Sequence, residues 1–235
     1  MGRGLRAAAL SLALAASVPV LAQQAPDPAR LRDVREIGVS TPVFLDGRTV
    51  VWEEPAPHPP CRLTPQALER RTIQALRSGV AGLRVLSSDD MAAEGRALVA
   101  DMAASERLVR ESRGGPVPPQ VREIEARAER RGAAMEERPY VLVRSASGQS
   151  APTGLCLGSV VTEVRVIPRD RPAIRGDRFI APAVLYEDAP CPIAARPGEA
   201  FQAAAEACVT RAMERLSAVL IAGRNLPAPP PPSAR

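Results

Sequence analysis

The sequence predicts an α+β fold, with one mostly antiparallel sheet, helices on one face and a helical hairpin at about 89–137. Three observations favour this class. Short apolar runs are typical of strands, long stretches show helical periodicity, and the two kinds of segment do not alternate regularly along the chain. Hydrophobic residues make up 46% of the 235 residues, which is enough to bury a core. We expect a single domain over 33–226.

The first strands form a hairpin. Asp46-Gly47 lies between the apolar runs 43–45 and 49–52, and Asp-Gly between apolar runs predicts a tight two-residue turn. A turn centred on these two residues would pair Val43 with Val50. Further strands are predicted at 140–144, 158–167 and 179–186, with a turn-rich loop at 145–153.

Two helices have clear start signals. Thr64 followed by proline is typical of an N-cap and first turn, and this helix is expected to end near Gly79. Ser87 and Asp90 match a capping box, which predicts a second helix running to about Ser112.

Proline and glycine residues at 114–119 stop the second helix, and a third is predicted from about Gln120 to Glu137. This third helix is dense in arginine and glutamate and has only a thin apolar stripe. The second and third helices together predict the antiparallel hairpin. A last helix has an apolar stripe from Phe201 to Leu220 and is expected to end at Gly223.

The N-terminus has the pattern of a secretory signal peptide over 1–22. Arg3 and Arg6 precede an apolar stretch at 7–20, and Ala22 offers a cleavage site for a signal peptidase. We therefore expect a periplasmic or secreted protein with no stable membrane span after cleavage, although an uncleaved anchor stays open. A loose leader is expected at 23–32 and a disordered proline-rich tail at 227–235.

All 31 basic residues are arginine, and they stand against 26 acidic residues. Removal of Arg3 and Arg6 leaves 29 basic residues and a net charge of only +3. Aromatic residues make up 3% of the chain, too few for the stacking platforms that nucleic acids need. We expect no nucleic-acid partner. The absence of lysine excludes Schiff-base chemistry and a P-loop.

Four cysteines would enter an oxidising compartment after export, where two disulfides are expected. Three pairings are possible. Cys191 lies in a proline-flanked loop just before the helix that carries Cys208, so this pair is preferred because a short chain connects them. The second pair, Cys61 with Cys156, follows by elimination. No cysteine spacing is typical of a zinc site.

Few residues offer catalytic chemistry. His58 is the only histidine, so Ser145, Ser147 and Ser150 have no obvious general base. Asp89 and Asp90 are interpreted as first-turn residues of a helix, where carboxylates are favourable. Arg175-Gly176-Asp177 is interpreted as a turn. We predict no catalytic residue, no metal site and no cofactor, so a non-enzymatic role is favoured.

Three functions follow from these observations. The first is an exported, non-catalytic protein that binds another envelope or secreted protein through the hairpin. The second is a periplasmic hydrolase whose carboxylates converge in the fold; its candidate acids are Asp89, Asp90, Glu163, Asp177 and Glu187. The third is a passive structural or assembly factor of the envelope. The sequence does not indicate an oligomeric state.

Overall fold

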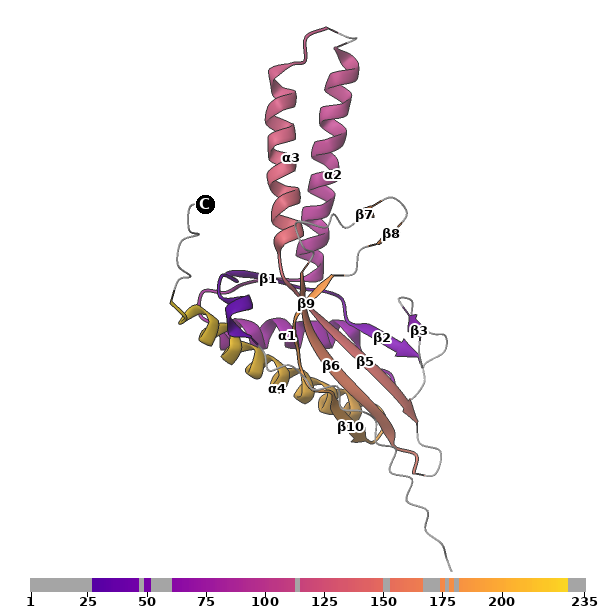
Figure 1. Ribbon diagram of the computed structural model, residues 1–235. Coiled ribbons are helices and arrows are strands. Elements are labelled where there is room, and N and C mark those ends of the chain that lie inside the picture. Colours follow the sequence, from indigo (N-terminus) through magenta and orange to yellow (C-terminus); the bar gives the residue numbers. More distant parts are fainter. Residues whose placement is uncertain are drawn as a thin grey trace, which may run out of the picture.

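The computed structural model describes residues 27–46, 49–51, 61–112, 115–149, 153–166, 174–175, 178–179 and 182–227. The predicted signal peptide at 1–22 and all but the first residue of the predicted tail lie outside this part. The described residues form an α+β fold, as predicted, with four α-helices and a mixed eight-stranded sheet (Figure 1).

The four helices match the predicted ones closely. They are α1 (Pro65–Gly79), α2 (Ser88–Glu111), α3 (Pro119–Glu137) and α4 (Glu199–Arg224). Ser87 accepts a hydrogen bond from the Asp90 backbone while the Asp90 carboxylate accepts one from the Ser87 backbone, so the predicted capping box is present. Thr64 occupies the N-cap position of α1 in extended conformation but makes no side-chain cap bond.

The sheet is built around a long antiparallel ladder. Its strands are β1 (Glu36–Val39), β2 (Val43–Asp46), β3 (Thr49–Val51), β4 (Arg84–Leu86), β5 (Tyr140–Gln149), β6 (Cys156–Val166), β9 (Ala183–Glu187) and β10 (Cys191–Ala195). The main path runs β10-β6-β5-β1-β4. β5 and β6 pair antiparallel, whereas β1 is parallel to both β4 and β5. A separate two-stranded ribbon joins β7 (Ile174–Arg175) to β8 (Arg178–Phe179).

Three local predictions are wrong. The β2–β3 hairpin pairs Val50 with Leu45 rather than with Val43, so its turn falls one residue later than predicted. The loop expected at 145–153 is largely strand, because β5 continues to Gln149 along its ladder with β6. Cys191, expected in a loop, begins strand β10. Single residues that favour turns do not end a strand where hydrogen bonds to a neighbouring strand continue.

The hydrophobic core lies between one face of the sheet and the pair α1 and α4. Phe201 and Leu216 of α4, Leu68 of α1 and Val143 of β5 are fully buried there. Gly158 of β6 makes room for Phe201, because a Cβ on this glycine would lie 3.1 Å from the edge of the ring. α1 and α4 therefore cover one face of the sheet, as expected.

The segment predicted as a loose leader is partly ordered. A 3₁₀ turn at Pro28–Leu31 packs against α4, and Leu31 is completely buried in the core. Gly223 near the end of α4 allows this approach, since a Cβ there would lie 2.4 Å from the Pro28 carbonyl oxygen. The folded domain thus begins by Asp27, several residues before the predicted boundary at 33.

Two disulfides tie the domain together. Cys61, just before α1, is joined to Cys156 at the start of β6, and Cys191 of β10 is joined to Cys208 of α4. The second is the pair favoured by the short chain between its cysteines, and the first is the pair left by elimination. Two disulfides within one domain indicate an oxidising environment outside the cytoplasm. No helix among the described residues is long and apolar enough to cross a membrane.

Candidate functional site

The helical hairpin of α2 and α3 projects away from the sheet (Figure 1). The two helices pack along each other, and only the first turns of α2 reach the body of the domain, at β1 and β4. Met91 makes that contact by lying over Gly38 of β1, where a Cβ would come within 2.3 Å of its sulfur. Most of the hairpin surface is consequently available to another molecule.

The two helices are joined by polar contacts as much as by apolar ones. Arg127 of α3 donates two hydrogen bonds to one oxygen of Asp101 on α2, at 3.1 and 2.7 Å. The hydrogen bonds from Arg127 hold the pKa of Asp101 below its usual value. Ser105 donates to Glu125 at 3.0 Å, and Val121 and Ala128 are the buried apolar residues of α3. These contacts between α2 and α3 determine which face of α2 points outward.

The outward side of α2 carries exposed apolar side chains among charged ones. Val99 is 65% exposed and Met102 is 59% exposed. Four alanines lie beside them and are also exposed: Ala92, Ala93, Ala100 and Ala103. We call these six residues the α2 outer face. Arg96, Glu106, Arg107 and Arg110 are exposed on the same side, so the face offers apolar contacts and charges together.

Two arginines lie among the alanines of the α2 outer face. Arg96 and Arg107 are eleven residues apart, which is close to three helical turns, so they project from the same side of α2. Both side chains are exposed, and neither pairs with a carboxylate within the described part of the chain. The α2 outer face therefore carries positive charge between its apolar residues.

A network of four charged residues holds the base of the hairpin. Arg138, which directly follows α3, pairs with Glu36 of β1 and with Glu94 of α2, and Arg84 of β4 pairs with the same Glu36. The Arg138 side chain is only 7% exposed. The network links both helices to two strands and therefore sets the direction in which the hairpin projects.

The described acids of the hydrolase hypothesis lie in two separate places, Asp89 and Asp90 at the start of α2 and Glu163 and Glu187 on the sheet. Asp89 and Asp90 are exposed at the start of α2, and the backbone and side chain of Ser87 lower the pKa of Asp90 by hydrogen bonding. Their interpretation as first-turn residues is consistent with this placement. Asp177 lies outside the described residues.

Glu163 and Glu187 do lie side by side, as paired residues of β6 and β9 on the sheet face opposite α1 and α4. Glu163 is 1% exposed, and its two carboxylate oxygens pair with different arginines, Arg144 and Arg165. Arg144 also reaches Glu187, at 3.8 Å. Because both Glu163 oxygens are engaged by guanidinium groups, this cluster is a structural ion-pair network rather than an acid-base pair.

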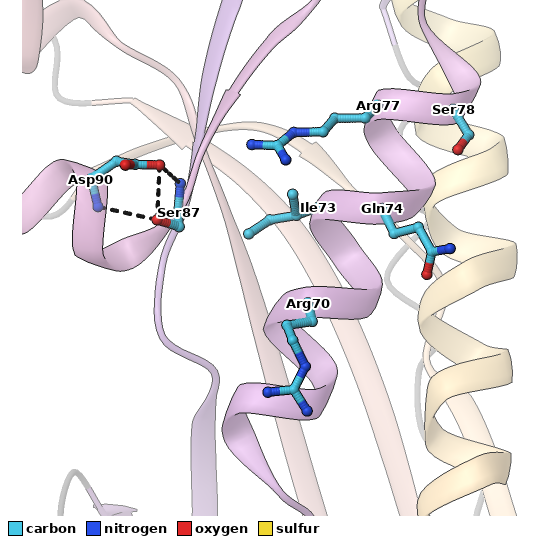
Figure 2. A pocket seen from close by; sticks show the side chains of 7 residues that line it. All are labelled: Arg70, Ile73, Gln74, Arg77, Ser78, Ser87 and Asp90. Atoms are coloured by element: carbon cyan, nitrogen blue, oxygen red, sulfur yellow. Dashed lines mark hydrogen bonds between the residues drawn. The ribbon is translucent and has the colours of Figure 1, made fainter.

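A shallow groove of about 570 Å³ separates α1 from the start of α2 (Figure 2). Ile73 and Arg77 point from α1 toward the side of Ser87 and Asp90, whereas Arg70 points along α1 away from them. Arg77 donates to the Val85 carbonyl oxygen at 2.9 Å, and Asp90 is held by Ser87. Arg77 is thus used in holding α1 to β4, and Ser87 with Asp90 in capping α2.

The remaining candidates are scattered or lie outside the described residues. Ser145 and Ser147 are on β5, and Ser145 is buried beneath the helices. His58, Ser150 and residues 176–177 are not described. Within the described ranges, no three histidine, cysteine or acidic side chains come close enough to hold a metal ion.

Comparisons with known proteins return nothing: no family model, no curated protein and no solved structure matches this chain. The function therefore has to be argued from the geometry of the molecule. The exposed α2 outer face, with Arg96 and Arg107, could not be located from the sequence. The alanines of α2 would be equally compatible with a helix surface packed against another element. The ion-pair networks of Arg138 and Glu163 gave no sequence signal.

Proposed function

We propose that this is an exported, non-catalytic protein of the bacterial periplasm that binds another envelope or secreted protein through the α2 outer face. The observation that carries the proposal is the exposure of Val99 and Met102 on a helix whose opposite side is already packed against α3. Contiguous exposed apolar surface is typical of an interaction site.

The partner that fits this face is an α-helix that presents apolar and acidic residues on one side. The alanines let a second helix backbone approach closely, and Val99 and Met102 supply apolar contact area. Arg96 and Arg107 would then pair with carboxylates on the partner. The proposed partner is therefore a helical segment of a different protein, with acidic residues among its apolar ones.

Charge disfavours a second copy of this chain as the partner. In a two-fold antiparallel pairing of α2 with its own copy, each edge of the helix lies beside the same edge of its mate. Arg96 and Arg107 would then face arginines, which costs binding energy.

Site-specific photocrosslinking tests the proposal. A photoreactive amino acid at Ala103, on the α2 outer face, should capture a different protein in the periplasm. The crosslinked residues of that protein should lie in a helix that carries acidic residues. The same amino acid at Ala133, which is exposed on α3, is the matched control and should capture little of that protein.

Reversing the charge of two arginines tests whether they bind the partner. Arg96→Glu with Arg107→Glu should abolish capture at Ala103 while the circular dichroism spectrum stays unchanged. Equal capture from both positions, capture that survives the charge reversal, or crosslinks only between two copies of this chain would each refute the proposed partner.

A further inference from the structure

The two disulfides differ in their access to solvent. Cys61 and Cys156 are both buried in the core, at 3% and 0% exposure. Cys191 is partly exposed at the first position of β10, an edge strand, whereas its mate Cys208 is buried on α4. A thiolate from outside could therefore reach the Cys191 sulfur, and the other disulfide is shielded.

Arg211 lies against the accessible disulfide. Its Nη2 atom is 3.2 Å from the Cys191 sulfur and 3.5 Å from the Cys208 sulfur, one helical turn after Cys208 on α4. Within the described residues this guanidinium pairs with no carboxylate, so its charge is directed at the two sulfur atoms. A neighbouring cation stabilises a thiolate, and a stabilised thiolate is a better leaving group in disulfide exchange.

We propose that Cys191–Cys208 is a thiol-exchange site, at which the thiolate of a small molecule or of an oxidoreductase attacks Cys191. The attacking sulfur gives its electron pair to Cys191 Sγ and forms a mixed disulfide. The Cys191–Cys208 bond breaks, and its electron pair leaves on Cys208 as a thiolate beside Arg211. A second thiol resolves the mixed disulfide, so that two external thiols are oxidised to a disulfide while the protein disulfide is reduced to two thiols.

Exchange at this site would act on β10 and leave the rest of the domain tied. The disulfide holds the edge strand β10 to α4, while Cys61–Cys156 independently joins the chain before α1 to β6. β10 lies at the end of the molecule remote from the hairpin (Figure 1). The site is therefore separate from the α2 outer face, and each proposal can fail without the other.

Differential alkylation tests the exchange site on the full mature chain. The folded protein is incubated with reduced glutathione, quenched with N-ethylmaleimide at intervals and mapped by peptide mass spectrometry. We expect glutathione on Cys191 and alkylation of Cys208 well before any label appears on Cys61 or Cys156. Glutathione found first on Cys208, or equal labelling of both pairs, would overturn the proposal.

The role of Arg211 has its own test. Arg211→Gln should slow the release of Cys208 about threefold, because the leaving thiolate loses the neighbouring cation that stabilises it. Arg211→Lys should keep most of the wild-type rate, and Arg110→Gln, on the hairpin, should keep all of it. An unchanged rate in a folded Arg211→Gln variant would show that this guanidinium does not assist the exchange.

Discussion

The Arg138 guanidinium donates a hydrogen bond to the Glu94 carboxylate at 2.6 Å, which connects the end of α3 to the second turn of α2. The same guanidinium pairs with Glu36 in the sheet. A projecting pair of helices with few contacts to the domain would otherwise be free to tilt. This nearly buried arginine gives the hairpin a defined direction relative to the sheet, which a rigid binding surface needs.

Replacing Arg138 should destabilise the protein. Arg138→Met leaves two carboxylates facing each other without the cation between them, and hydrogen bonds to charged groups contribute about 1.5–3 kcal/mol each at partly buried sites. We expect a loss of about 1–3 kcal/mol in the free energy of unfolding, measured by urea denaturation. Arg122→Met, an exposed arginine on α3, is the control and should change stability by less than about 0.5 kcal/mol. Equal effects of the two variants would contradict the proposed role.

The capping box of α2 should make stability depend on acid pH. Hydrogen bonds from Ser87 lower the pKa of Asp90 in the folded state, so the charged carboxylate stabilises the fold above the unfolded pKa of about 3.9. This contribution is lost as the pH falls from there through the folded pKa. Asp90→Asn should cost about 0.5–1 kcal/mol at pH 7 and almost nothing at pH 2, by thermal denaturation. A penalty of the same size at both pH values would contradict this account.

The stability of the protein at alkaline pH should depend on Tyr186. Burial, with a smaller contribution from Asp188, raises the pKa of Tyr186 to about 12. Between pH 10 and 12 the unfolded chain loses the Tyr186 proton while the folded protein keeps it, so stability falls as the pH rises. The chain has no lysine to mask this effect and only two tyrosines. Tyr186→Phe should flatten the fall in urea midpoint between pH 9 and 11, and an unchanged slope would show that Tyr186 does not cause it.

Alanine should destabilise the end of α4, against the usual preference of helices for alanine. In Gly223→Ala the new methyl group would meet the Pro28 carbonyl oxygen and push the 3₁₀ turn away, with an expected cost of about 1–3 kcal/mol. Gly132→Ala on α3 is the matched control, since its Cβ would lie 3.9 Å from Leu98. That variant should gain up to about 1 kcal/mol in calorimetry. A gain in both variants would show that the turn adapts to the new methyl group.

Helix ends were predictable because their signals are local. Ser87 with Asp90, the prolines near 118 and the threonine at 64 each act within one turn of the chain, and the structure places helix boundaries within a residue or two of them. Strand ends depend on a neighbour that lies far away in sequence. The extension of β5 to Gln149 and the strand at Cys191 both come from pairing with β6 and were missed for that reason.

The candidate binding face was only partly predictable. The hairpin and its charged third helix follow from the sequence, but the local signals in α2 do not say which side of this helix is covered by α3. That depends on the Asp101–Arg127 contact, a pairing across the hairpin that residue spacing does not reveal. The ion pairs of Arg138 and Glu163 likewise join residues that only the fold brings together.

The Cys61–Cys156 disulfide closes a covalent ring of the chain, and both helices of the hairpin lie inside that ring. A protease that cuts between α2 and α3 would therefore open the ring without releasing a fragment. The nicked protein would migrate as one chain on a non-reducing gel and as two on a reducing gel. The same holds for a single cut anywhere in α2 or α3, so the disulfide protects the whole helical arm against loss by one cleavage.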